Sequence, residues 1–258
     1  MEFKNEMGIL QRLVASSSAG ISRRQAILET LVINSNDKII DIGCGAGDLL
    51  IHLIKAINVD GHVYGLDPSE DQIENARIKC AQFKNITFLN NSADKIDLPE
   101  NTCNIATSTQ TFEYIKNVDD ALIETTRVLK SGASLINISV LWDYFRFYGA
   151  EKKLNDKIHD AFKEHCYHQM LPMELPGKLS NLGFSNIKNK SLSFIITHRD
   201  QNSPARYAED VIAFFVKSQG ISQNEISDWK DQLNRAENEG RFGFTSFPVL
   251  TEAFLNKN

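Results

Sequence analysis

The feature that most constrains the fold is a glycine cluster that directly follows a short β-branched run. Residues 38–42 read Lys-Ile-Ile-Asp-Ile, and Gly43, Gly45 and Gly47 follow at alternate positions. Glycine adopts backbone conformations that other residues avoid, and it leaves room for a ligand where a Cβ would collide. Apolar residues then recur at helical spacing from Asp48 to about Ala56. The segment predicts a strand, a tight ligand-binding turn and a helix.

The chain continues to alternate between strand and helix patterns up to Val140. Further strands are expected at 63–66, 86–89, 103–108 and 134–140, and helices at 69–83, capped by Ser69, and at 118–130, ended by Ser131-Gly132. Such alternation implies an α/β fold with a parallel sheet covered by helices on both faces.

Beyond Val140 this alternation is lost. We expect an aromatic-rich helical stretch at 142–167, helices at 172–182, 207–218 and 222–238, a polar linker at 199–204, and strands at 184–197 and 241–250.

Composition excludes several classes of protein. The 258 residues are 42% hydrophobic and 24% charged, which is typical of a globular chain, and the net charge of −5 argues against a nucleic-acid partner. The four cysteines form no CxxC pair, so no metal site is expected. Because the sequence also lacks a signal-peptide pattern and a run long enough to span a membrane, we expect a cytoplasmic protein with no membrane span.

The spacing of the glycines distinguishes between two classes of cofactor. A dinucleotide fingerprint reads GxGxxG and places a pyrophosphate at the helix N-terminus. Here the spacing is GxGxG, Asp48 occupies the place of the third glycine, and Asp41 precedes the turn. Carboxylates there would repel a pyrophosphate but suit a ligand with an ammonium group. The pattern favours S-adenosylmethionine over NAD.

Two further strand ends carry acidic residues that suit a nucleoside. Asp67, about 20 residues past the turn, can accept hydrogen bonds from both ribose hydroxyls, and Asp94, in Ser92-Ala93-Asp94, can accept one from the exocyclic amine of adenine. The carboxyl ends of parallel strands meet at one edge of a sheet, so these groups should converge on one ligand.

These motifs resemble those of the class I S-adenosylmethionine-dependent methyltransferases, particularly the ubiquinone/menaquinone-biosynthesis-like (methyltransferase type 11) branch. The matches cover about residues 20–140, and include the glycine motif at Ile39–Gly47 and a later pattern at Glu113-Tyr114-Ile115 and Glu124–Gly132. Ser131 and Asn104 depart from the family's usual proline and aspartate, at positions that should not touch the methyl group.

The resemblance implies a Rossmann-like, mostly parallel seven-stranded sheet with an antiparallel last strand and a helical cap insertion. We therefore expect one domain over 1–258. Its parts would be an N-terminal helical lid (1–35), a cofactor-binding core (36–140), a substrate-covering cap (141–170 and 205–240), and the final strands with their helix (171–198 and 241–258).

The expected cofactor contacts come from the turn and the strand ends. They are Asp41, Gly43, Cys44, Gly45, Gly47, Asp67, Pro68, Ser69, Gln72, Ser92, Ala93, Asp94, Thr109 and Gln110. Cys44 is interpreted as a small packing residue and not as a nucleophile.

Methyl transfer is an in-line displacement that depends chiefly on positioning, so a dedicated catalytic residue is optional. If the acceptor is a hydroxyl, the candidate bases are His165, His168, Tyr144 and Asp143. The aromatic group of Trp142, Tyr144, Phe145, Phe147 and Tyr148 would line an acceptor pocket or form the core under the cap. Arg23 and Arg24 would close over the cofactor, meet an anionic substrate or lie on a solvated helix face.

The sequence thus predicts an enzyme that methylates oxygen, nitrogen or carbon of a small molecule and releases S-adenosylhomocysteine. The acceptors considered are aromatic or apolar. A non-catalytic, cofactor-binding regulatory protein and a protein methyltransferase remain as alternatives. A nucleic-acid enzyme is disfavoured, because Thr107-Ser108-Thr109-Gln110 stands where an Asn/Asp-Pro-Pro-aromatic motif would be expected. The residues of the cap do not identify the acceptor, and the oligomeric state is not predicted.

Overall fold

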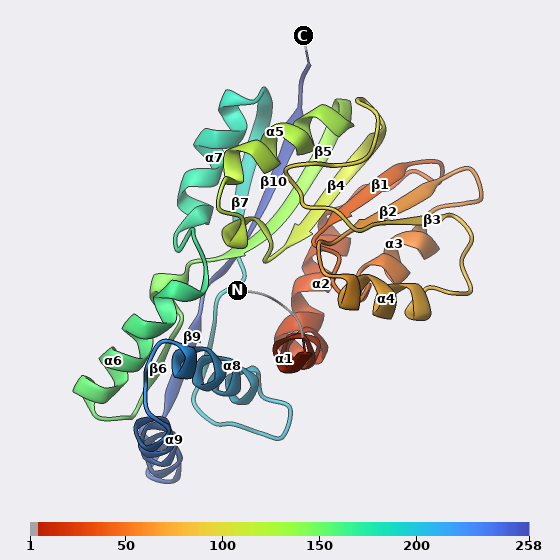
Figure 1. Cartoon of the computed structure of the whole chain (residues 1–258). Helices are drawn as coiled ribbons and strands as arrows, with labels where there is room; N and C mark the ends of the chain where they lie inside the picture. Colours follow the sequence, from red (N-terminus) through yellow and green to blue (C-terminus); the bar gives the residue numbers. More distant parts are fainter. Residues whose placement is uncertain (1–4, 258) are drawn as a thin grey trace.

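The computed structural model describes residues 5–257, with side chains from residue 8 onward, so residues 1–4 of the expected lid and residue 258 lie outside the described part. Its centre is a seven-stranded sheet in the order β3-β2-β1-β4-β5-β10-β7 (Figure 1). The strands are β1 (Lys38–Ile42), β2 (His62–Leu66), β3 (Ile86–Leu89), β4 (Cys103–Thr109), β5 (Leu129–Val140), β7 (Phe184–Ser191) and β10 (Pro248–Leu255). The first five run parallel, and β10 is antiparallel to both β5 and β7. The expected sheet is confirmed.

Helices cover both faces of this sheet because its central strands are apolar on both sides. Ile39 of β1 packs with α2 (Ser18–Thr30), α3 (Leu50–Ala56) and α4 (Glu70–Lys79). Ile40 and Ile42 face the opposite way, toward α5 (Val118–Val128) and α7 (Leu171–Asn181). Each fully buried isoleucine contributes about 1.5–3 kcal/mol relative to exposure. This burial fixes the position of the turn that follows β1.

The segments after β5 build a second unit against the carboxyl end of the sheet. It contains a three-stranded antiparallel sheet, β6-β9-β8, and three helices. Its elements are β6 (Arg146–Tyr148), α6 (Lys152–Phe162), β8 (Phe194–Ile196), α8 (Pro204–Ser218), α9 (Gln223–Asn238) and β9 (Gly243–Ser246), with short 3₁₀ turns at Trp142–Tyr144 and Lys163–His165. We call residues 142–165 and 194–246, which contain these elements, the cap.

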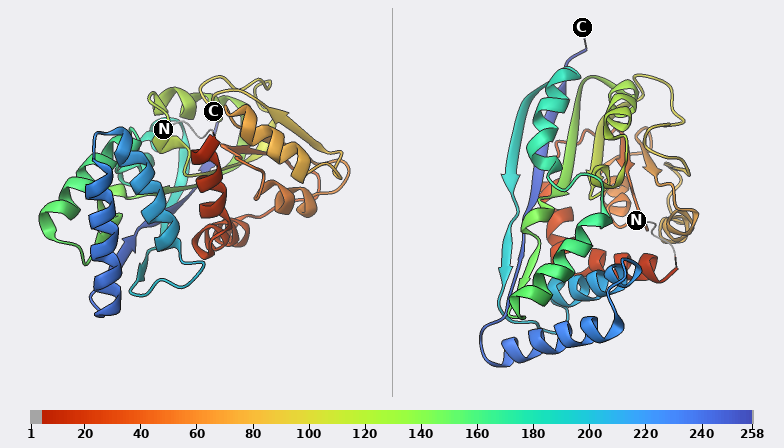
Figure 2. Two further views of the ribbon diagram at one scale, coloured as in Figure 1. Left: turned by 60° about the horizontal axis from the view of Figure 1, so that its bottom comes forward. Right: turned by 60° about the vertical axis from the view of Figure 1, so that its left-hand side comes forward.

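The N-terminal helices lie between the cap and the sheet. Helix α1 (Asn5–Ser16) contacts α8 of the cap, and the two helices lie side by side in both Figure 1 and Figure 2. Helix α2 then continues to the sheet, where it contacts β5 and β10. Helices α1 and α2 therefore connect the cap to the sheet.

Several predicted boundaries were wrong. Helix α5 ends at Val128, and Ser131 and Gly132 belong to β5, because Leu129 already pairs with Cys103 in the sheet. Helix α4 ends at Lys79, short of Phe83, and Ser69 occupies its N-cap position without a side-chain capping bond.

The expected strands at 184–197 and 241–250 are each broken. Their first and second parts join different sheets, with one break between β7 and β8 and the other at Phe247, between β9 and β10. Residues 146–148, expected as helix, form β6 because they pair with β9.

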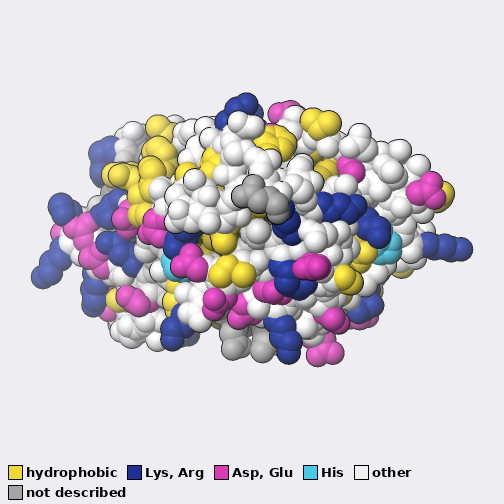
Figure 3. Space-filling model, turned by 90° about the horizontal axis from the view of Figure 1, so that it is seen from above, with side chains coloured by type: hydrophobic (Ala, Val, Ile, Leu, Met, Phe, Trp, Pro, Cys, Tyr) yellow, Lys and Arg dark blue, Asp and Glu magenta, His cyan; other side chains and the backbone are white. Residues whose placement is uncertain are grey.

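Charges of both signs are interspersed on the face shown in Figure 3. Among residues 5–257, no helix is long and apolar enough to cross a membrane.

Candidate functional site

The glycine turn after β1 folds back against the end of β2. The N–H groups of Gly43 and Cys44 both donate to the carbonyl of Leu66, at 2.7 and 2.9 Å. Gly43 has a φ of +75°, and a Cβ there would lie 2.0 Å from Thr111 Oγ1. Only glycine fits this position, for reasons of both backbone conformation and space.

Asp67 joins the turn to the end of β2. Its Oδ2 accepts a hydrogen bond from the Gly45 N–H, and its Oδ1 accepts one from the Ser69 N–H, both at 2.9 Å. The carboxylate is buried, and desolvation raises its pKa even though these two bonds lower it. Asp67 therefore helps to build the turn as well as offering a carboxylate beside it.

Asp41 is a second buried carboxylate at the same place. Thr107 Oγ1 donates to its Oδ1 at 2.8 Å. Burial raises the pKa of Asp41 to about 7, with a further contribution from the charge of Asp67, although the bond from Thr107 opposes it. Two buried carboxyl groups of raised pKa form an environment that a ligand cation would relieve.

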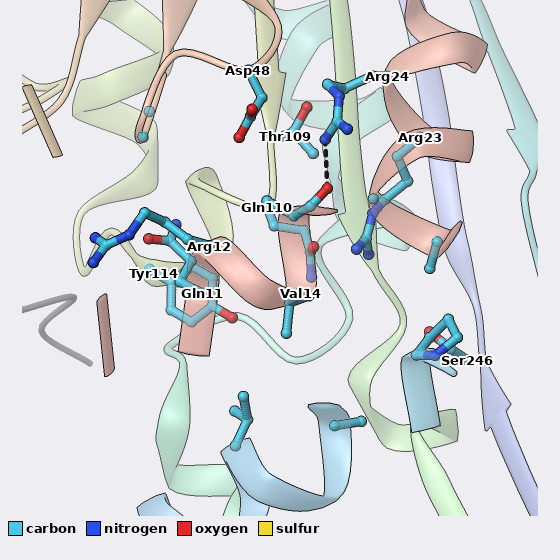
Figure 4. A pocket seen from close by; sticks show the side chains of 18 of the residues that line it. Gln11, Arg12, Val14, Arg23, Arg24, Asp48, Thr109, Gln110, Tyr114 and Ser246 are labelled. Carbon is cyan, nitrogen blue, oxygen red and sulfur yellow. Dashed lines mark hydrogen bonds between the residues drawn. The ribbon is translucent and has the colours of Figure 1, made fainter. Parts of the chain in front are cut away.

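A cavity of about 190 Å³ opens beside the turn and extends into the cap (Figure 4). Its floor includes Asp41, Gly43, Cys44, Gly45 and the end of β4, Thr109-Gln110. Helices α1 and α2 supply one wall, and Figure 4 shows side chains from both facing the space. These N-terminal wall residues are Gln11, Arg12, Val14, Ala15, Ala19, Gly20, Arg23 and Arg24.

The far end of the cavity is lined by aromatic side chains, which we call the aromatic chamber. Its members are Tyr114, Trp142, Phe145, Phe162, His165, Phe194 and Phe244. Trp142 is central: its ring centroid lies 4.9 Å from that of Phe145 and 4.3 Å from that of His165. Such clusters offer an apolar surface to a flat ligand. Ala208 and Val211 of α8 close the chamber from the cap side.

The contacts of His165 fix the tautomer and the protonation state of its ring in the aromatic chamber. Nδ1 donates to the carbonyl of Phe162 at 2.7 Å, so Nε2 is an acceptor in the neutral ring. Nε2 has no hydrogen-bond partner among the described residues, and burial lowers the pKa of His165 to about 4. The imidazole is therefore neutral at physiological pH.

The other three candidate bases lie elsewhere. His168 Nε2 bonds to the carbonyl of Ile115 at 3.0 Å, Tyr144 is 53% exposed, and Asp143 is exposed; none of them lines the cavity. Trp142 and Phe145 of the aromatic group line it, whereas Phe147 is core and Tyr148 is exposed.

The structure brings about half of the expected cofactor residues to the cavity. Asp41, Gly43, Cys44, Gly45, Gln72, Thr109 and Gln110 line it. Gly47, Asp67, Pro68, Ser69, Ser92, Ala93 and Asp94 are outside its lining. Among these, Ala93 packs in the core, and Ser92 and Asp94 are exposed at the end of β3.

Sequence reasoning expected a helical lid over residues 1–35 but named no residue of α1 as part of the site. Gln11 accepts a hydrogen bond from Gln72 Nε2 at 2.8 Å, which ties α1 to α4 beside the turn. It also missed Tyr114, Phe162, Phe194 and Phe244 of the chamber. The alternation of Phe242 and Phe244 was a partial signal for an aromatic surface, but it was interpreted only as evidence for a strand. Within the described ranges, no group of His, Cys, Asp and Glu residues could hold a metal.

Comparisons with known proteins agree with this architecture. A family model described as a methyltransferase domain matches residues 33–210. The demethylmenaquinone methyltransferase of Geobacillus sp. is 25% identical over 191 residues, which cover 66% of this chain and 80% of that enzyme. The enzyme of the same name from Staphylococcus aureus is 29% identical over 122 residues, 44% of this chain, and the match spans only 47% of that enzyme. The crystal structure of YcgJ from Bacillus subtilis superimposes with a TM-score of 0.66 at 15% identity, over 92% of this chain and 100% of that one.

Proposed function

Because the chain belongs to the class I family of S-adenosylmethionine-dependent methyltransferases, we propose that it methylates a small apolar or aromatic acceptor bound in the aromatic chamber. The observation that carries this proposal is the continuity of the cavity. One space extends from the glycine turn to the chamber, so a donor at the turn would face an acceptor in the chamber.

The turn fits the amino-acid part of the cofactor. Gly43 and Gly45 line the cavity with positive φ angles of +75° and +51°, and Asp41 and Asp67 supply negative charge for an ammonium and a sulfonium group. Asp67 would also accept hydrogen bonds from the ribose hydroxyls, and the exposed Asp94 would accept one from the exocyclic amine of the adenine. S-adenosylmethionine supplies an electrophilic methyl group on a cationic sulfur.

The protein contributes to the reaction by positioning the two reactants and by excluding water. An in-line displacement is accelerated mainly by holding the two reactants in line, and apolar walls keep competing water away. Helices α1 and α8 contact each other, and both line the cavity, which favours a small acceptor over a protein chain. The names of two relatives give demethylmenaquinone as the molecule that those enzymes methylate, and a flat acceptor of that kind suits the chamber.

His165 is the favoured proton acceptor if the methylated atom carries a hydrogen. Its neutral Nε2 could accept a hydrogen bond from an acceptor hydroxyl and take the proton as the new bond to carbon forms. Within the residues that the structure describes, Trp142 Nε1 is likewise buried with no hydrogen-bond partner, and its ring lies against that of His165, so it offers a further donor.

The test combines cofactor binding with product detection. The protein is incubated with methyl-labelled S-adenosylmethionine and a panel of small aromatic compounds, and labelled products are separated. Ala208→Phe, which fills the chamber from α8, should abolish product formation and leave S-adenosylhomocysteine affinity within about threefold. Product formation that survives this change would contradict the proposed acceptor site. Tight cofactor binding with no product from any acceptor would favour a non-catalytic role.

A further inference from the structure

Arg23 of α2 is a buried cation that faces the cavity, and it has no partner in the described part of the chain. The residue is 8% exposed and lines the cavity, and Figure 4 shows its guanidinium pointing into the space. Among the side chains of residues 8–257, it has no hydrogen-bond partner and no ion-pair partner within 4.0 Å. Buried arginines are normally paired, because removing a charge from water without compensation is costly. The exposed helix face considered from the sequence is therefore wrong for Arg23.

Other arginines show how this fold usually satisfies a guanidinium. Arg24, next in sequence, donates from Nη1 to the carbonyl of Ala15 at 2.6 Å. Arg199, which is more deeply buried, bonds to Glu209, Glu237 and Asn234. Arg23 has no equivalent set of acceptors, so its donors are available to a ligand.

Glu113, whose charge acts on Arg23, forms no ion pair with it among the described residues. Glu113 is fully buried, and its carboxyl group accepts hydrogen bonds from Ser139 Oγ at 2.9 Å and from the Val140 N–H at 3.4 Å. Burial raises the pKa of Glu113 to about 7, and the charge of Arg23 is the smallest influence acting on it. Burial lowers the pKa of Arg23 to about 10, so the guanidinium remains charged at neutral pH.

The surroundings of Arg23 place it toward the acceptor end of the cavity. The groups that raise its pKa are Tyr114 and Glu113, and not the carboxylates of the glycine turn. The ring of Tyr114 contacts those of Trp142 and His165 in the chamber, with centroid distances of 6.4 and 5.8 Å. A ligand seated against these rings would bring its polar edge toward Arg23.

We propose that Arg23 binds an anionic oxygen of the acceptor, so that the substrate class is an aromatic compound with a carboxylate or an ionised hydroxyl group. This inference rests on the proposed function, since it assigns the acceptor of the same site. The guanidinium presents several donors to a planar anion, and in a cavity shielded from water such charge-assisted bonds are strong. The aromatic chamber would hold the ring, and Arg23 would select for charge.

The experiment compares two probes of the same shape. Protein saturated with S-adenosylhomocysteine is titrated calorimetrically with 2-naphthoate and with the neutral 2-naphthamide. Wild type should bind the naphthoate at least about tenfold more tightly. Arg23→Met, which keeps the volume but removes the charge, should abolish this preference, and Arg23→Lys should retain part of it. Arg77→Met removes a positive charge from α4 outside the cavity and should change neither affinity.

A second pair of ligands separates the acceptor from the cofactor as the source of the anion. S-adenosylhomocysteine carries a carboxylate, whereas methylthioadenosine lacks the amino-acid part. If Arg23→Met weakens only the first of these, Arg23 serves the cofactor and the proposal is overturned. Equal affinity of wild type for the two naphthalene probes, or no naphthoate binding at millimolar concentration, would also overturn it. Failure of wild type to bind S-adenosylhomocysteine at all would instead overturn the proposed function.

Discussion

Oδ2 of Asp67 accepts a hydrogen bond from the Gly45 N–H at 2.9 Å, which fixes the end of β2 to the turn after β1. The two residues are 22 positions apart in sequence. The carboxylate that we assign to the ribose therefore also holds the backbone assigned to the amino-acid part of the cofactor. Cofactor affinity should depend on this bond in two ways, through direct contact and through the shape of the turn.

Gly43 should be intolerant of any side chain. In Gly43→Ala, the new Cβ would meet Thr111, and the positive φ adds strain. We expect a loss of more than about 3 kcal/mol in the free energy of unfolding, measured by urea denaturation, together with loss of S-adenosylhomocysteine binding.

Gly132→Ala is the matched control for this change. Gly132 has a φ of +82°, but no described atom lies within 4 Å of a Cβ built there, so this variant measures the cost of the positive φ alone. That variant should lose only about 1 kcal/mol and should bind the cofactor normally. Equal losses in the two variants would show that space at Gly43 is not limiting.

Cofactor affinity should fall as the pH is lowered through about 7. The pKa of Asp41 is raised to about 7, so below that pH the free protein carries the neutral acid. A ligand ammonium group favours the ionised form, and binding must then release a proton, so the dissociation constant rises as the pH falls. Titration with S-adenosylhomocysteine between pH 8 and 5.5 should show a decrease of up to about tenfold per pH unit below 7.

Asp41→Asn cannot ionise and should bind weakly with a nearly flat pH dependence over the same range. A flat dependence in wild type would mean that Asp41 does not face the ligand cation.

A substitution that destabilises the cap should leave cofactor binding intact. Asn155 is buried, accepts a hydrogen bond from Trp229 Nε1 at 2.9 Å and donates to the carbonyl of Phe147 at 2.8 Å. Asn155→Ala leaves both partners buried and unsatisfied, and should destabilise the protein by about 2–4 kcal/mol. Thermal unfolding measures the loss, and S-adenosylhomocysteine affinity should stay within about twofold.

Asn224→Ala, on the exposed face of α9, serves as the control and should change stability by less than about 0.5 kcal/mol. If Asn155→Ala also abolished cofactor binding, the cap would be required to form the turn.

The part of the fold nearest the glycine turn was predictable because its signals are local. The run at 38–42 and the alternate glycines are recognised from adjacent residues, and Asp67 directly follows the short strand pattern at 63–66. The cap was predicted less well because its structure depends on distant pairing. Residues 146–148 form a strand only because β9, about a hundred residues later, lies beside them.

The candidate site shows the same division. The residues of the turn were predicted from spacing, whereas the chamber combines Tyr114, Phe162, Phe194 and Phe244 from four separate segments. No periodicity in the sequence relates these positions. A lid was expected over residues 1–35, but its contacts were equally hidden, because Gln11 becomes informative only when its contact with Gln72 is seen.

The central claim, that this is a cofactor-dependent methyltransferase with its donor at the glycine turn, is tested most directly by calorimetric titration with S-adenosylhomocysteine. Wild type should bind one equivalent, and Asp67→Asn should bind at least about tenfold more weakly. Asp37→Asn is the control, because Asp37 is also buried and accepts a backbone hydrogen bond, from the Asn34 N–H at 2.7 Å, but precedes β1 and lies outside the cavity. Its affinity should match wild type. Folded wild-type protein that fails to bind S-adenosylhomocysteine would contradict the claim.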